Sequence, residues 1–147
     1  MKAVIQRVKK ASVSVEGEVI SSIGKGFLIL LGIQVGDTEE DIDYLSRKIA
    51  FLRIFERDGK FNDSLMDIGG EALVVSQFTL LGRTERGNRP DFLLAEKPPR
   101  AEELFNMFCE KLSEYVPVKR GIFGARMNVS LINNGPVTII IDSRREK

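Results

Sequence analysis

The chain has 147 residues, of which 43% are hydrophobic and 29% charged, and its net charge at pH 7 is +1. This balance predicts one domain over residues 1–147 and excludes binding of nucleic acid through bulk positive charge. With no histidine and one cysteine, Ser-His and Cys-His nucleophiles, an internal disulfide and an ordinary zinc site are excluded. We therefore expect no metal and no cofactor. The N-terminus lacks a signal-peptide layout and the longest apolar run is residues 27–31, so we expect a cytoplasmic protein with no membrane partner.

The first third of the chain predicts an antiparallel meander. Residues 2–8 contain β-branched valines and predict a strand, and residues 12–15 alternate polar and apolar side chains as in a half-buried strand. Glycine-containing turns then lead into strands at 19–23 and 27–31. The last of these is apolar throughout, so we expect it at the centre of a sheet.

A helix is predicted next, over residues 38–51. Four apolar residues between positions 42 and 52 recur at helical spacing, and Asp37 and Glu40 have the spacing of a capping box. This amphipathic helix is expected to cover one face of the sheet. A short strand at 53–56, a turn at 58–59 and a loop at 62–70 are expected to follow.

The strand expected at 72–80 changes character along its length. Its first residues, 72–75, are apolar, whereas Ser76, Gln77 and Thr79 are polar. Taken alone, this pattern favours polar groups that satisfy the local backbone over a substrate site at the rim of the core.

Residues 81–100 contain no convincing regular element, and Arg83, Arg86 and Arg89 alternate through them. A loop of this length in a compact domain is usually functional or disordered, and its position after the 72–80 strand favours a function. Residues 98–99, both proline, then begin a second helix. Its apolar stripe consists of Ala101, Leu104, Phe105, Phe108, Leu112 and Tyr115. Cys109 lies beside this stripe and is expected to be an inert packing residue.

The remainder of the chain predicts an edge strand at 116–122, an alternating strand at 127–131 and a strand at 137–141 that is buried on both faces. A turn at 133–135 is expected between the last two, and residues 143–147 are expected to fray. Strands outnumber helices. The predicted class is therefore α+β, with an antiparallel-rich, curled and barrel-like sheet and two main helices.

Two short motifs, Ser76-Gln77-Phe78-Thr79 and Gly135-Pro136-Val137-Thr138, resemble the paired SQFT and GPVT signatures of the D-aminoacyl-tRNA deacylases. Further segments are similar to that family in order along the chain: residues 3–8, 52–55, 59–62, 89–90, 123–125 and Met127. The resemblance covers nearly the whole chain and implies the same barrel-like fold.

The resemblance implies an enzyme that hydrolyses the ester bond of D-aminoacyl-tRNA and rejects L-aminoacyl groups, with glycyl-tRNA mischarged on tRNA-Ala as a further possible substrate. It implies catalysis by Gln77, Phe78 and Thr79. The implied substrate-binding residues are Ser76, Phe123, Met127, Gly135, Pro136, Val137 and Thr138. The partners would be tRNA and a second copy of the chain, without DNA. Candidate tRNA contacts are Arg83, Arg86 and Arg89, for each of which a solvated surface is the simpler explanation.

Such a reaction needs little from side chains, because an aminoacyl ester is already activated. Backbone N–H groups can stabilise the developing oxyanion, and the vicinal ribose hydroxyl can help to activate water. The candidate donors are the N–H groups of Gln77 and Phe78. No base is evident for Thr79, which favours an orienting hydroxyl over a nucleophile.

The dipeptide Gly135-Pro136 is the second element of the predicted site. About 5–6% of X-Pro bonds are cis, so the residues alone predict a trans bond, whereas the resemblance implies cis. A cis turn would direct two carbonyl oxygens to one side, where they could bind the substrate amino group and exclude an L side chain. The resemblance places this turn in the active site of the partner subunit. It also implies that Arg7, otherwise a surface charge, braces the turn.

Three residues depart from the pattern of the family, namely Arg83, Asp91 and Arg126. They leave the preferred tRNA open without changing the predicted reaction. Two alternatives also stay open. A deacylase for N-blocked or L-aminoacyl substrates would be expected to change the Gly-Pro turn, and a non-catalytic tRNA-binding module would not need the SQFT motif.

Overall fold

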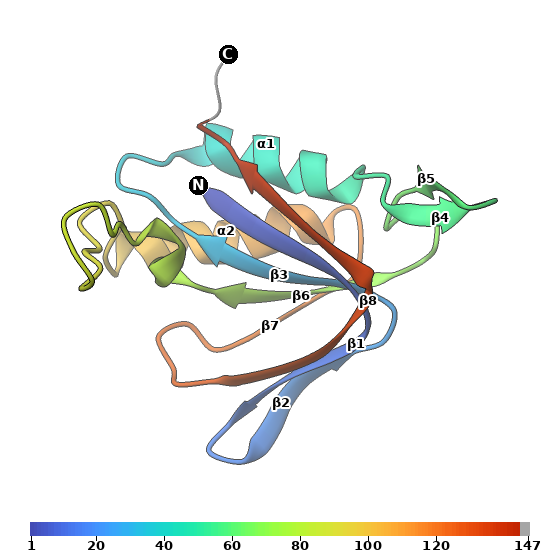
Figure 1. Cartoon of the computed structure of the whole chain (residues 1–147), viewed down its shortest axis with the longest axis horizontal. Coiled ribbons are helices and arrows are strands. Elements are labelled where there is room, and N and C mark those ends of the chain that lie inside the picture. The colour runs from blue at the N-terminus through green and yellow to red at the C-terminus, as the bar shows by residue number, and fades with distance from the viewer. Residues whose placement is uncertain (145–147) are drawn as a thin grey trace.

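The computed structural model describes residues 1–144, in which a curled sheet is packed against helices on one side (Figure 1). The strands are β1 (Lys2–Val15), β2 (Glu18–Ile23), β3 (Gly26–Gly32), β4 (Phe55–Arg57), β5 (Lys60–Asp63), β6 (Glu71–Ser76), β7 (Val118–Arg120) and β8 (Asn128–Asp142). The helices are α1 (Glu39–Ala50), α2 (Arg100–Ser113) and the short 3-10 helix η1 (Phe78–Leu81). The predicted α+β class with two main helices is confirmed. Among the described residues, no helix is long and apolar enough to cross a membrane.

Strand β1 organises the main sheet. It pairs antiparallel with β2, β3 and β8, and the strand order β2-β1-β3-β6-β7 continues through parallel pairs on the far side of β3. The sequence predicted separate strands at 2–8 and 12–15, which was wrong. Strand β8 pairs with both halves of β1, and this pairing keeps β1 continuous.

The sheet curls until its two ends approach each other, which gives the predicted barrel-like shape. Strands β2 and β7 are the outer members of the strand order. Ser21 Oγ donates to the carbonyl oxygen of Arg120 at 2.7 Å, and Lys119 Nζ donates to that of Ser22 at 2.8 Å. Side chains thus complete the closure, and β7 is the edge strand that the sequence predicted.

The core has two layers because the curled sheet has two covered faces. Alternate residues of β3, such as Phe27 and Ile29, pack with α1 and α2, whereas Leu28 points into the curl with Leu73 and Val75. Successive side chains of a strand point to opposite faces, so a strand covered on both sides must be apolar throughout. This explains the continuous apolar runs of β3 and β6.

The start of α1 differs from the prediction by one residue. Thr38 is the N-cap: its hydroxyl accepts from Glu40 N at 3.3 Å, and the Asp41 carboxylate accepts from Thr38 N at 2.8 Å. The capping box is therefore Thr38 with Asp41, and the predicted pair of Asp37 and Glu40 was wrong.

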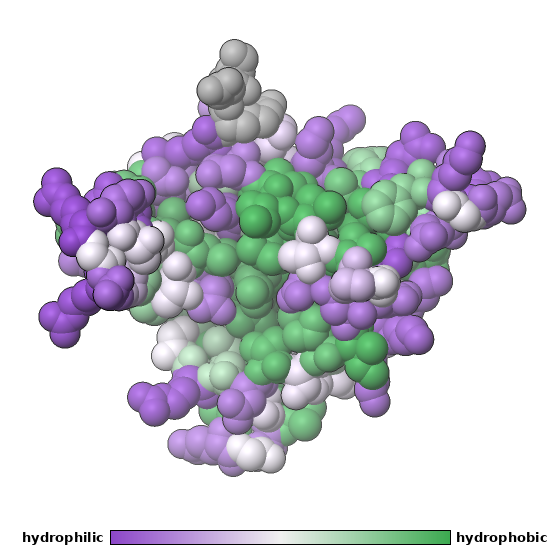
Figure 2. Space-filling model, viewed as in Figure 1, coloured by the Kyte–Doolittle hydropathy of each residue, from purple (hydrophilic) through white to green (hydrophobic). Residues whose placement is uncertain are grey.

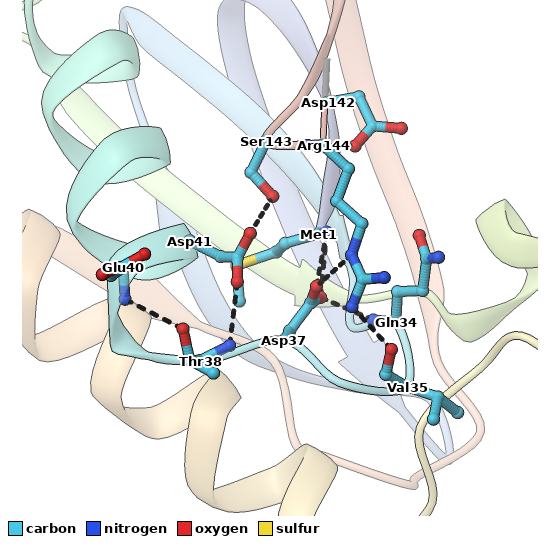
Figure 3. Close-up of polar contacts among 10 residues, drawn as sticks. All are labelled: Met1, Gln34, Val35, Asp37, Thr38, Glu40, Asp41, Asp142, Ser143 and Arg144. Carbon is cyan, nitrogen blue, oxygen red and sulfur yellow. Dashed lines mark hydrogen bonds and ion pairs between the residues drawn. The ribbon is translucent and has the colours of Figure 1, made fainter. Parts of the chain in front are cut away.

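Asp37 instead binds groups from both ends of the described chain (Figure 3). Its carboxylate is buried and accepts hydrogen bonds from the ammonium group of Met1, at 3.0 Å, and from Arg144 Nε, at 3.0 Å. Ser143 Oγ donates to Asp41 at 2.6 Å. The expected fraying was therefore wrong for residues 143 and 144, and residues 145–147 lie outside the described part.

Several element boundaries also differ. Strand β6 ends at Ser76, because residues 78–81 turn into η1, and β5 occupies residues 60–63, where no strand was predicted. The expected turn at 133–135 is a bulge within one long strand, β8. Ile140 is 67% exposed, so the second half of β8 is buried on one face only.

Candidate active site

A pocket of about 540 Å³ opens where β6 ends. Its walls come from Ser76, Gln77 and Phe78, from the start of α2, and from residues 123–125 and 127 between β7 and β8. Most of the wall is apolar, and Glu96 and Lys97 at the rim contribute ionisable side chains. Concave, largely apolar sites with a few convergent polar groups are typical of ligand binding.

The backbone leaves the sheet immediately after β6. Gln77 N still donates to the carbonyl oxygen of Leu31 at 2.8 Å, so this N–H group is engaged in extending the sheet. The next residues, Phe78 and Thr79, begin η1, and the first N–H groups of a helix have no partner within it. The N–H group of Gln77 is therefore already engaged in the structure, whereas no hydrogen bond within η1 uses the N–H groups of Phe78 and Thr79. The oxyanion role of these groups stays a prediction.

Gln77 and Thr79 are joined through their side chains. Gln77 Nε2 donates to Thr79 Oγ1, which leaves the hydroxyl proton of Thr79 to donate elsewhere. Thr79 is exposed and lies beside the pocket wall, whereas Ser76, Gln77 and Phe78 line it.

Phe123 and Met127 lie on the opposite wall. The Phe123 ring packs on Phe105 of α2 with ring centroids 5.9 Å apart. A Cβ atom at Gly121 would lie 2.7 Å from the sulfur of Met127, so the glycine makes room for the methionine side chain. The structure thus brings Ser76, Phe123 and Met127 to one pocket, and their role in substrate binding stays a prediction. Phe92, Ala95 and Ala101 also line this pocket, and no sequence pattern indicated them.

The Gly-Pro motif lies elsewhere in the same chain. The pairs Gln6–Thr138 and Val8–Asn133 enclose one residue of β1 and four of β8, so residues 134–137 bulge outwards. Gly135 and Pro136 are exposed, and the bond between them is cis. They do not line the described pocket. Figure 1 shows the bend of β8 on the right of the sheet and the end of β6 on the left.

Asn133, which the sequence did not single out, closes this bulge. Its side-chain oxygen accepts from Val137 N at 2.8 Å, and its amide nitrogen donates to Thr138 Oγ1 at 2.9 Å. Both bonds join residues on the two sides of Gly135-Pro136, so the bulge is fixed by its own strand.

Arg7 lies beneath the bulge and is 5% exposed, so its interpretation as a surface charge was wrong. Its Nε atom donates to the carbonyl oxygen of Asn134 at 2.9 Å. Its other nitrogens donate to the carbonyl oxygen of Ile54 at 2.7 Å and to the Glu56 carboxylate at 3.1 Å. Arg7 therefore connects the bulge to β4, and Glu56 is a further residue that sequence patterns did not reveal.

The 81–100 loop contributes residues 92 and 95–98 to the pocket wall, and its arginines lie outside that lining. Arg86 and Arg89 are exposed, whereas Arg83 is half-buried and forms an ion pair with Asp91 at 3.1 Å. Figure 2 shows hydrophilic side chains gathered on the part of the molecule where Figure 1 draws this loop, on the left. Arg126 is also exposed. Across residues 1–144, no group of three or more His, Cys, Asp or Glu side chains is placed to hold a metal ion.

The fold and the pocket can be compared with known proteins. The family model described as D-Tyr-tRNA(Tyr) deacylase matches residues 4–142. A D-aminoacyl-tRNA deacylase of Persephonella marina (strain DSM 14350 / EX-H1) is 60% identical over 145 residues, which cover 98% of this chain and 99% of the relative. The corresponding protein of Thermoanaerobacter pseudethanolicus (strain ATCC 33223 / 39E) is 53% identical over 147 residues, with 99% of each chain covered.

Solved structures agree with the fold. One described as c-Myc DNA Unwinding Element Binding Protein has a TM-score of 0.93 and 49% identity, and the match covers 99% of this chain and 100% of the other. Another, described as a structural analysis of a probable eukaryotic D-amino acid tRNA deacylase, has a TM-score of 0.83 with 95% and 97% covered. Its identity is 16%, so it supports the fold alone.

The family model and the two relatives thus place the chain among the hydrolases of the D-aminoacyl-tRNA deacylase class. More particularly, the chain belongs to the D-Tyr-tRNA(Tyr) deacylase family.

Proposed function

We propose that the chain hydrolyses the ester bond of D-aminoacyl-tRNA in the pocket at the end of β6, and that Gly135-Pro136 of a second copy completes this pocket. The proposal is supported by the separation of the Gly-Pro bulge from the pocket within one chain. The two motifs are each held firmly in place, yet the Gly-Pro bulge faces outwards and lies away from the pocket of its own chain. In this proposal, a second copy supplies the bulge that the pocket of one chain lacks.

Catalysis in this proposal rests on the backbone. The N–H groups of Phe78 and Thr79 stabilise the oxyanion that forms when water attacks the ester carbonyl. The bond between the carbonyl carbon and the ribose oxygen then breaks, and a proton passes to that oxygen. The adjacent ribose hydroxyl assists the water, while Gln77 holds the Thr79 hydroxyl in position. The products are the free D-amino acid and tRNA.

Selection against L substrates is assigned to the Gly-Pro bulge of the second copy. A backbone element can obstruct one side of the α-carbon while accepting many side chains on the other, which side-chain contacts cannot do. A glycyl group has no side chain to be rejected. The same mechanism therefore accepts glycyl-tRNA, including glycyl groups mischarged on tRNA-Ala.

Exposed apolar side chains on β8 support the association of two copies. Ile132 is 45% exposed and Ile140 is 67% exposed, on the same strand as the bulge. Figure 2 shows hydrophobic side chains gathered in the middle of the face over which β8 runs in Figure 1. Apolar patches of this kind are typical of surfaces that another chain covers. We propose a homodimer on this basis.

Contact with tRNA is assigned to Arg86 and Arg89, which are exposed on the loop beside the pocket. The chain has a net charge of +1, so these local contacts, and no general attraction to DNA or RNA, provide the affinity. Each phosphate contact contributes about 0.9 to the log–log salt slope on duplex, so a modest salt dependence is expected. Because charged tRNA is the substrate, we place the reaction in the cytoplasm, and we expect residues 1–147 to act as one domain.

The test is deacylation of D-tyrosyl-tRNA and L-tyrosyl-tRNA side by side, under single-turnover conditions and with the protein in excess. The proposal predicts hydrolysis of the D ester only, also for D-tyrosyl-adenosine in EDTA, because no step requires a metal. A non-catalytic tRNA-binding module would bind both tRNAs and hydrolyse neither. Equal hydrolysis of both enantiomers, or loss of activity in EDTA that zinc or magnesium restores, would overturn the proposal.

A further inference from the structure

The loop between η1 and α2 contains a pair of residues outside both motifs. We propose that Arg83 and Asp91 form a clasp that positions residues 84–90 for tRNA and thereby sets the affinity for tRNA without acting on the ester. This inference rests on the proposed function, in which Arg86 and Arg89 of the same loop contact the tRNA phosphates.

The clasp is formed by backbone and side chains together. The backbone N–H group of each residue donates to the carbonyl oxygen of the other, at 2.9 Å in both directions. The guanidinium of Arg83 donates to Asp91 Oδ1 at 3.1 Å, and the same oxygen accepts from Leu93 N at 3.2 Å. The hydrogen bond from Leu93, together with the Arg83 guanidinium, lowers the pKa of Asp91. The carboxylate is therefore charged throughout the neutral range, and the loop is closed at its base.

The clasp adjoins the pocket wall directly. Phe92 follows Asp91, lines the pocket and packs edge to face on Phe78, with ring centroids 5.2 Å apart. Gly82 precedes Arg83, and a Cβ atom at Gly82 would lie 2.9 Å from the Phe92 ring. The segments that enter and leave the loop are therefore in close contact. The base of the loop is thus fixed relative to the backbone N–H groups at the start of η1.

This arrangement divides the roles of the three arginines. The Arg83 guanidinium already has a carboxylate partner, whereas Arg86 and Arg89 lie exposed in the seven residues that the clasp encloses. A loop closed before binding loses less conformational entropy when tRNA binds. Arg83 and Asp91 were both noted as departures from the family pattern, and in the structure they are partners in one contact. Arg83 is therefore a positioning residue, and the phosphate contacts are assigned to the other two.

The direction in which Asp91→Ser changes the KM for D-tyrosyl-tRNA distinguishes the clasp from a simple effect of charge. Asp91→Ser keeps an acceptor for Leu93 N but removes a negative charge beside the arginines, which by charge alone would strengthen tRNA binding. The clasp predicts the opposite result. The KM for D-tyrosyl-tRNA should rise about twofold to fivefold, the range expected for a partly exposed ion pair, while kcat and the hydrolysis of D-tyrosyl-adenosine stay unchanged. Glu85→Ser is the matched control, because it removes an exposed negative charge from the same loop without changing the Arg83–Asp91 pair. This control should lower the KM or leave it unchanged.

The experiment measures these kinetics for Asp91→Ser, Arg83→Ala and the double variant. Partners in one contact give non-additive effects, so the double variant should resemble the single ones. Amide hydrogen exchange should show faster exchange across residues 83–91 in all three. If Asp91→Ser lowers the KM as Glu85→Ser does, or if the effects add, the clasp is refuted. If replacing Arg86 and Arg89 together leaves the KM for tRNA unchanged, the loop is not the tRNA contact and the proposed function fails at that point.

Discussion

Arg7 and Asn134 are 127 positions apart in the chain, and Arg7 Nε donates a hydrogen bond to the Asn134 carbonyl oxygen at 2.9 Å. This bond ties the Gly-Pro bulge to the middle of β1, and the remaining nitrogens of Arg7 tie it to β4. The position of the bulge therefore depends on a buried side chain that does not line the pocket.

Arg7→Lys should weaken this connection although the charge is kept. A lysine ammonium cannot reproduce the fixed fork that reaches two carbonyl oxygens and a carboxylate. We expect the free energy of unfolding in urea to fall by about 1–3 kcal/mol, because buried acceptors lose their donor. The rate for D-tyrosyl-tRNA should fall as well. Wild-type stability and activity in this variant would show that the connection has no role.

Gly135→Ala should damage the bulge through its backbone. The φ angle of Gly135 is +136°, and a Cβ atom there would lie 2.9 Å from an Arg7 nitrogen and 2.8 Å from a Val137 methyl group. We expect about 1–3 kcal/mol of destabilisation and a loss of D-tyrosyl-tRNA hydrolysis. Gly17→Ala is the control, since Gly17 has a φ of +80° with open space around it. It should cost stability without a specific loss of activity. Equal activity losses in the two variants would contradict a specific role for the bulge.

Thr79→Ala should slow the reaction without abolishing it, because the backbone N–H groups remain. The loss of an orienting hydroxyl should reduce kcat by about tenfold to a hundredfold, below the loss typical of a principal oxyanion donor. Thr79→Ser keeps the hydroxyl and should act nearly as wild type. A covalent acyl-enzyme ester trapped on Thr79 would instead identify a nucleophile.

Cys109 should be unreactive in the folded protein. Its side chain is fully buried among the residues of α2 that pack on the sheet, and burial raises the pKa of its thiol to about 12. The thiolate is the reactive form, so at pH 8 a thiol reagent should modify Cys109 only after unfolding in urea. Rapid labelling under native conditions, or loss of deacylation after labelling, would contradict this role as a packing residue.

The sequence predicted those parts of the fold that depend on local patterns. The apolar runs of β3 and β6 and the stripe of α2 follow from periodicity, and Cys109 was correctly expected in the core. Sequence patterns predicted the structure wrongly where a residue distant in the chain determines the local contacts. Asp37 does not cap α1, because the Met1 ammonium and Arg144 occupy its carboxylate.

The same limit applies to the site. Ser76, Gln77 and Phe78 were identified from a short motif, but the engagement of Gln77 N depends on Leu31 in another strand. The burial of Arg7 depends on carbonyl groups 47 and 127 positions away. The bulge could not be told from a turn, since continuous pairing with β1 on both sides is what makes β8 a single strand.

The most direct test of a site shared between two copies is complementation between two inactive variants. Ala125→Phe fills the pocket, and Gly135→Ala damages the bulge, so each protein alone should be inactive. In an equilibrated equal mixture, half of the dimers are mixed, and each has one intact site of two. A shared site therefore predicts recovery of about a quarter of the wild-type rate with D-tyrosyl-tRNA. A mixture that never exceeds the activity of the separate variants, or a fully active monomer, would contradict the shared site.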